Sequence, residues 1–112
     1  MNQETALKIL SEVYAAYSQI LPKPIHDAFL YGSFARGDFH EESDVDIFIT
    51  VDMSREEMKP YEDKMATVKS DLGLENDVFV SVIVTPLALF QKYAEDLPYY
   101  MNILAEGIRY AA

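Results

Sequence analysis

Two aspartates, Asp44 and Asp46, stand two residues apart at the start of a segment with strand composition, Val45 to Val51. Side chains alternate across a strand, so both carboxylates are predicted to lie on one face. Like charges on one face repel each other, and aspartate is a poor strand former. A bound cation would relieve this repulsion, because Mg²⁺ is usually held by one or two carboxylates with water and phosphate oxygens. A solvated strand start is the alternative interpretation of such a pair alone.

A turn of small residues precedes the aspartates. An apolar run of strand length, Ala28 to Tyr31, ends at Gly32 and Ser33. Ser33 could cap a short helix whose free N–H groups point outward, and glycine lets a phosphate approach the backbone closely. An ordinary turn is the alternative for this dipeptide alone. Together with the aspartate pair, however, the turn predicts a site for a nucleoside triphosphate.

The segment GSFARGDFHEESDVDIFI resembles the signature of the DNA polymerase β-like nucleotidyltransferase superfamily, and specifically of its minimal nucleotidyltransferases. The residues that carry the resemblance are Gly32, Ser33, Ala35, Arg36, Gly37, Ser43, Asp44 and Asp46. The C-terminal segment YYMNILAEGIRYAA is more loosely similar to the closing helix of these proteins. The resemblance implies a polymerase β-like palm, Mg²⁺ held by Asp44 and Asp46, and ATP or another nucleoside triphosphate bound through Gly32 and Ser33. Arg36 could contact the phosphates, or it could pin the acidic loop through an ion pair.

A third carboxylate is less clear. Full members of the superfamily hold two metal ions with three carboxylates, the third of which stands on a later central strand. In the apolar segment VFVSVIV, Val78 to Val84, the polar position is Ser81, and the nearest carboxylate is Asp77, just before the segment. Either Asp77 completes the metal site, if the register places it opposite Asp44, or no residue does.

The composition limits the remaining functions. The chain has 112 residues, which predicts a single domain over residues 1–112. Its formal charge is −10, from 19 acidic and nine basic residues, and this balance disfavours nucleic-acid binding, which depends on phosphate neutralisation by Lys and Arg. No stretch has the length of a membrane span, no signal peptide is recognisable and no cysteine is present, so the cytoplasm is the expected compartment.

The hydrophobic periodicity predicts an α/β (α+β) domain: a small, mostly three-stranded mixed sheet with helices packed mainly on one face. The predicted helices are Thr5 to Leu21, Met53 to Leu72 ended by Gly73, a helix capped by Thr85 that runs to about Ala94, and one from Leu97 to Gly107. Pro60 indicates that the second helix could instead begin near Lys59. Ile108 is predicted to close a Schellman turn after the last helix. The strand Val78 to Val84 is predicted to be buried on both faces.

Three functions remain open. The leading one is Mg²⁺-dependent transfer of a nucleoside monophosphate, AMP from ATP, to a hydroxyl, with a partner protein as the acceptor. Minimal nucleotidyltransferases of this kind are commonly antitoxins paired with a HEPN-domain toxin, and some add AMP to a tyrosine of that toxin. The second is an antitoxin that neutralises its partner by contact alone. The third is modification of a small molecule such as an antibiotic. The oligomeric state, homomeric or heteromeric, is also open.

Overall fold

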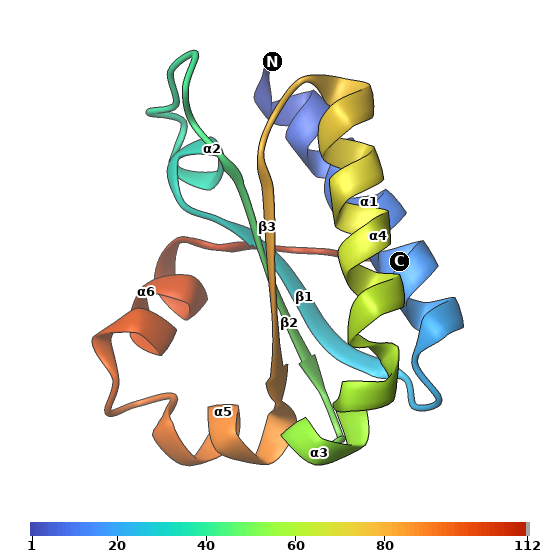
Figure 1. Ribbon diagram of the computed structural model, residues 1–112. Helices are drawn as coiled ribbons and strands as arrows, with labels where there is room; N and C mark the ends of the chain where they lie inside the picture. Colours follow the sequence, from blue (N-terminus) through green and yellow to red (C-terminus); the bar gives the residue numbers. More distant parts are fainter. Residues whose placement is uncertain (112) are drawn as a thin grey trace.

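A four-stranded mixed sheet forms the centre of the chain, and the computed structural model describes residues 1–111. The strand order is β3-β2-β1-β4, with β1 antiparallel to both β2 and β4, and β2 parallel to β3 (Figure 1). In chain order the elements are α1 (Gln3–Ile20), β1 (Ile25–Tyr31), α2 (Ser33–Arg36), β2 (Val45–Val51), α3 (Arg55–Met58), the 3-10 helix η1 (Lys59–Tyr61), α4 (Glu62–Asn76), β3 (Val80–Pro86), α5 (Leu87–Tyr93), α6 (Pro98–Glu106) and β4 (Ile108–Arg109). The predicted small mixed sheet is therefore confirmed, and β4 adds a strand to it.

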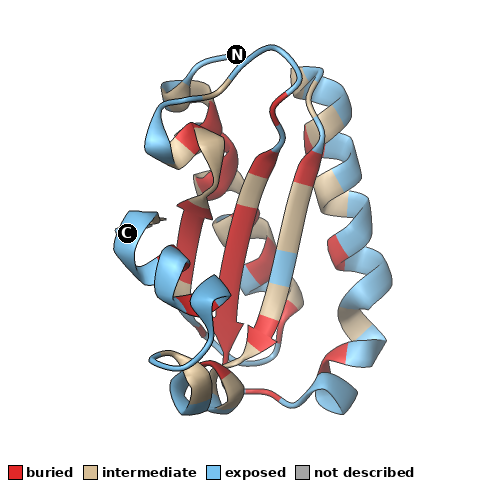
Figure 2. Cartoon of the chain, turned by 90° about the vertical axis from the view of Figure 1, so that its left-hand side faces the viewer, coloured by how far each residue is buried: buried red, intermediate tan, exposed pale blue. Residues whose placement is uncertain are grey.

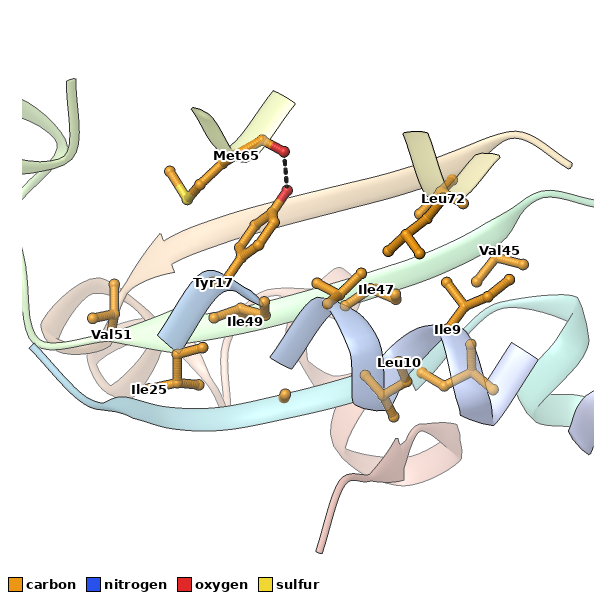
Figure 3. Packing of buried hydrophobic residues seen from close by; sticks show 14 of the residues in the cluster. Ile9, Leu10, Tyr17, Ile25, Val45, Ile47, Ile49, Val51, Met65 and Leu72 are labelled. Carbon is orange, nitrogen blue, oxygen red and sulfur yellow. Dashed lines mark hydrogen bonds between the residues drawn. The ribbon is translucent and has the colours of Figure 1, made fainter. Parts of the chain in front are cut away.

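The two long helices, α1 and α4, cover one face of the sheet (Figure 1). Alternate residues of β2, namely Val45, Ile47, Ile49 and Val51, are fully buried beneath them. Figure 3 shows how Tyr17 of α1 crosses this core and donates a hydrogen bond of 2.9 Å to the carbonyl oxygen of Met65 in α4. Burial of these side chains is the main force that holds helices to sheet.

The opposite face of the sheet carries a smaller cluster under α5 and α6. Phe48 of β2 is fully buried there, with its ring centroid 5.3 Å from that of Phe90 and 5.7 Å from that of Tyr100. Figure 2 shows α6 in front of this part of the sheet, whereas no helix covers β3 on this side. The long helices thus lie on one face, as expected, and only short helices partly cover the other.

The C-terminal end differs from the predicted Schellman turn. Gly107 has an extended backbone, with φ −69° and ψ 149°, and Ile108 and Arg109 form β4 opposite Leu30 and Phe29 of β1. Glycine is needed here because a Cβ at position 107 would collide with the carbonyl oxygen of Ile103. A strand of two residues that pairs with a distant segment has no recognisable pattern in the local sequence, so it could not be predicted.

Helix α4 also continues past the predicted stop at Gly73. It ends at Asn76, and Asp77 then adopts the left-handed conformation that ends the helix, with φ 51° and ψ 49°. Gly73 serves a different purpose, since a Cβ there would lie 2.7 Å from the carbonyl oxygen of Val78. The glycine therefore allows the chain to return closely past α4 toward β3.

Strand β3 lies at the edge of the sheet, so the prediction that it is buried on both faces is wrong. Ile83 keeps 39% of its surface exposed and Phe79, just before the strand, keeps 64%. The strand also runs on to Pro86, so Thr85 is a buried sheet residue rather than a helix cap. A continuous apolar run is typical of a central strand that helices cover on both faces. Strand β3 is instead the last strand of the sheet and has a neighbouring strand along one edge only.

The helical region after β2 begins as predicted and is then interrupted. Ser54 and Glu57 form the expected capping box, each side chain accepting from the other's backbone N–H. Pro60 ends regular α-helix and gives the 3-10 helix η1, so α4 begins at Glu62. In residues 1–111, no helix is long and apolar enough to cross a membrane.

The Tyr17 hydroxyl provides a test of the core. We expect Tyr17→Phe to lower the free energy of unfolding by about 1 kcal/mol, because it removes one buried hydrogen bond without changing the ring. Tyr14→Phe is the matched control, since Tyr14 packs against Tyr110 with ring centroids 4.5 Å apart and keeps that contact as phenylalanine. Urea denaturation of both variants measures the difference; equal losses would contradict this account of the Tyr17 hydrogen bond.

Candidate active site

Asp46 is the second residue of β2 and points to the face that carries α5 and α6. In register across the sheet, its neighbours are Tyr31 at the end of β1 and Ser81 in β3. Asp44 stands just before β2 and is exposed, whereas Asp46 is half-buried. From Val45 on, the two-residue period continues without a bulge in the pairing with β3, so Asp46 lies on one face with Phe48 and Thr50. Asp44 precedes this ladder, and its place on the same face stays a prediction.

The electrostatics of Asp46 are unfavourable in the free protein. Burial raises the pKa of its carboxyl group, the negative charge of Asp44 raises that pKa further, and Arg36 opposes both effects. The two carboxylates therefore resist being charged together. Their oxygens are the hard ligands that Mg²⁺ prefers, and a cation would remove both penalties, so the residues present fit a divalent metal ion.

Gly32 brings the turn after β1 against this carboxylate. Its backbone has φ 76° and ψ −156°, and a Cβ built there would lie only 2.5 Å from Oδ2 of Asp46. Any larger residue would displace the aspartate, and it would also carry the cost of a positive φ. The glycine turn and Asp46, which belong to separate segments of the sequence, thus lie against each other.

The short helix α2 follows this turn, and its cap differs from the predicted one. Gly32, rather than Ser33, is the N-cap residue, and its carbonyl oxygen accepts from the N–H groups of Ala35 and Arg36. The N–H groups of Ser33 and Phe34 take no part in these bonds. Phe34 is buried and stacks on Phe39, which holds the helix in place against β1 and α1.

Arg36 makes two ion pairs at the end of α2. Its Nε lies 3.3 Å from Asp38 in the following loop, and its Nη1 lies 3.7 Å from Glu106 at the end of α6. Its side chain is 43% exposed. The ion pair with Asp38 corresponds to one of the two predicted roles of Arg36, the pinning of the acidic loop. Contact with phosphates stays a prediction.

No third carboxylate joins the pair. Within residues 1–111, no group of three His, Cys, Asp or Glu side chains lies close enough together to hold a metal ion. Ser81 is the residue opposite Asp46 on β3, whereas Asp77 ends α4 and borders a hollow with His40 and Glu41. The structure therefore does not bring Asp77 to the aspartates.

Two tyrosines beside the site were not identified from the sequence. The hydroxyl groups of Tyr31, in β1, and Tyr99, in α6, lie 2.9 Å apart. Burial is the largest cause that raises the pKa of each phenol, and the charge of Asp46 contributes to both shifts. Tyr31 directly precedes Gly32, which is a signal that could have found it, but nothing local connects Tyr99 to the site.

A hollow of about 200 Å³ opens between this tyrosine pair and the glycine turn. Its lining comes from β1, α2 and α6, and consists of Tyr31, Gly32, Arg36, Tyr99, Asn102, Ile103 and Glu106. Polar groups from three elements therefore surround a space that reaches Gly32, the residue that lies against Asp46.

Comparison with known proteins identifies a matching family model, two similar sequences and a similar fold. Residues 10–110 match the family model described as a nucleotidyltransferase domain. Two proteins of Methanocaldococcus jannaschii, provisionally named protein adenylyltransferases, are similar: one is 31% identical over 84% of this chain and 93% of its own length, and the other is 33% identical over 96% of each. A crystal structure of a toxin–antitoxin with AMP-PNP shares the fold, with TM-score 0.52 and 16% identity over 97% of this chain and 72% of the other.

The contact between Gly32 and Asp46 can be tested with a matched pair of glycines. Gly32 and Gly37 both have positive φ, but nothing lies within 4 Å of a Cβ at Gly37. Gly37→Ala should therefore cost only the backbone strain, about 1–2 kcal/mol. Gly32→Ala should cost clearly more, because it pushes Asp46 aside and because the ψ of Gly32, −156°, lies in a region essentially limited to glycine. Denaturant unfolding gives both values. Equal costs would show that the turn yields without disturbing the aspartate.

The charge of Asp46 predicts a dependence of stability on pH. Its folded-state pKa is raised, so the native state binds more protons than the unfolded state, and stability falls as pH rises through that pKa. Asp46→Asn should therefore raise the melting temperature at about pH 7 and lose this advantage below about pH 4. Asp52→Asn, which removes a carboxylate at the far end of β2, is the control. An Asp46→Asn variant that is no more stable than this control at neutral pH would contradict the assignment.

Proposed function

Because the chain belongs to the nucleotidyltransferase domain family and is a nucleotidyltransferase, we propose that it transfers AMP from Mg-ATP to a hydroxyl group of a partner protein. The observation that carries the proposal is the contact of the Gly32 turn with Asp46. A backbone turn that admits phosphate, next to carboxylates that need a cation, suits a metal-bound triphosphate better than other ligands.

On the donor side, we assign the phosphates to Gly32 and Ser33. Their backbone and the Ser33 hydroxyl lie at the start of α2, where N–H groups remain for an anion. Asp44 and Asp46 would hold Mg²⁺, which supplies charge neutralisation at the triphosphate and favours ionisation of the attacking hydroxyl. The hollow that ends at Tyr99 and Asn102 gives the nucleoside room beyond the phosphates.

Arg36 can join the phosphates in this scheme. Its ion pairs with Asp38 and Glu106 are long and exposed, and such pairs contribute about 0–1 kcal/mol. A triphosphate carries more charge than either carboxylate and can therefore compete for the guanidinium group. Arg36 would then leave Glu106 and hold the phosphates from the side of α2.

The reaction itself is a displacement at phosphorus. The acceptor oxygen forms a bond to the α-phosphorus, the bond from that atom to the leaving pyrophosphate breaks, and the hydroxyl proton passes to solvent. The chain's own contribution is to fix the triphosphate against the sheet and to hold it in line with the acceptor. No covalent enzyme intermediate is required.

A protein is the acceptor class that we favour. The two relatives from Methanocaldococcus jannaschii carry the name protein adenylyltransferase, and the similar crystal structure is a toxin–antitoxin with AMP-PNP. The acidic balance of the chain disfavours a nucleic acid. We accordingly propose a toxin of the HEPN type as the partner, and ATP as the donor.

Neutralisation by contact alone is the second candidate. It is favoured by the absence of a three-carboxylate cluster within residues 1–111, since the aspartate pair would then support nucleotide binding better than turnover. Both candidates need a partner protein, but only the transferase attaches AMP covalently to it.

Incubation with Mg-ATP and the partner distinguishes the two. We expect mass spectrometry to show the addition of AMP to the partner, and we expect Asp44→Asn and Asp46→Asn to reduce the rate by at least about a hundredfold, the usual cost of losing a charge-stabilising group. Asp52→Asn should react normally. If both site variants neutralise the partner as well as the parent protein does, without any mass change, then contact is the mechanism.

A further inference from the structure

A groove of about 340 Å³ runs between β3 and α4, on the face of the sheet opposite to the aspartate pair. Val82 and Val84 of β3 form one wall, and Met58 and Met65 belong to the floor and the other wall. Figure 3 shows Met65 and Tyr17 joined by their hydrogen bond at this end of the core, close to the β3 ribbon. The side of the groove along β3 is thus apolar, and the groove lies beside the edge of the sheet.

The backbone of β3 along this groove is free to pair. The N–H of Val45 donates to the carbonyl oxygen of Phe79, and the register with β2 is continuous from Val80 to Pro86. By the two-residue period of a parallel ladder, Ser81 and Ile83 direct their backbone groups toward β2. Val80, Val82 and Val84 direct theirs away from the sheet, because β3 is its last strand.

This edge lacks the usual protection against strand pairing. Natural edge strands carry lysine, an inward charge, a bulge or a central proline. Strand β3 reads VSVIVTP, without lysine or bulge, and its proline is the last residue. On the other face, exposed Phe79 and Ile83 lie beside the same edge. An added strand would therefore find apolar partners on both faces.

The charge of the groove is opposite to that of the chain. Arg55, Lys59 and Lys69 line it, against one acidic residue, Glu62. The whole chain has nine basic and 19 acidic residues, so a third of its basic residues gather here. A segment that binds in this groove is best matched if it carries carboxylates.

We propose that this groove binds an extended, apolar and acidic segment of a partner protein, which adds to β3 as a further strand. Alternate side chains of the segment fill the space beside Val82 and Val84, and its carboxylates meet Lys59 and Lys69. Because β3 lies between them, the added strand would run two strand spacings, about 10 Å, from β2, the strand that carries Asp46. The docking site is independent of nucleotide transfer.

A second copy of the chain fits the groove less well. Pairing of β3 with β3 about a two-fold axis would bring the Arg55, Lys59 and Lys69 cluster of one copy toward that of the other. It would also join two chains of formal charge −10. Repulsion between the two basic clusters and repulsion between the two net charges both disfavour a second copy, and they favour a different partner with a locally acidic segment.

Synthetic peptides test the proposal in the absence of nucleotide. The probe is a short fluorescent peptide with a Val-Thr-Val-Thr-Val centre flanked by glutamates, and its counterpart has lysines instead. We expect only the glutamate peptide to bind, and we expect Lys59→Glu or Lys69→Glu to weaken it at least about tenfold. Lys64→Glu is the matched control, since it makes the same charge change on α4 outside the groove lining. No binding of the glutamate peptide, or equal binding of both peptides, overturns the proposal.

The mode of binding has its own readouts. Hydrogen exchange at the Val82 and Val84 amides should slow when the peptide binds. N-methylation of one alternate set of peptide amides should abolish binding, whereas methylation of the other set should not. If light scattering instead finds the chain alone to be a dimer that Val82→Lys, with an unchanged melting temperature, converts to a monomer, a second copy occupies the edge and the proposal is wrong.

Discussion

The close approach of the Gly32 backbone to the Asp46 carboxylate is the constraint on which the site depends. It requires β1 and β2 to pair so that Tyr31 stands opposite Asp46, because only then does the turn after β1 meet the second residue of β2. Shifting the pairing by one residue would turn every side chain of β2 to the other face. The position of one carboxylate is thus tied to the register of the whole strand.

Burial on both faces of β2 fixes that register. Val45, Ile47 and the residues that follow them on one face fill the core under α1 and α4, while Phe48 fills the cluster under α5 and α6. Neither set could exchange with the other without exposing large apolar area, which costs about 25 cal/mol for each Å². The electrostatic penalty at Asp46 is tolerated because this packing leaves the strand no alternative position.

Much of this could be predicted from the sequence, because the informative features were local. The position of Asp46 on the face of Phe48 follows from a period of two, and the capping box at Ser54 follows from a spacing of three. The errors came from contacts between distant segments. The pairing of Ile108 with β1 and the approach of Tyr99 to Tyr31 join residues about 70 positions apart or more, and the edge position of β3 depends on the order of all strands.

The hollow beside Gly32 is lined by two segments that lie far apart in the sequence, and this sets an order of assembly during synthesis. The segment that carries Gly32 and Asp46 leaves the ribosome early, and β1 can pair with β2 across a short connection. Tyr99, Asn102 and Glu106 emerge only with α6, just before β4 completes the sheet. A nascent chain can therefore pair β1 with β2 and bring Gly32 against Asp46 before the hollow exists, and the hollow is complete only once α6 has been synthesised and has packed.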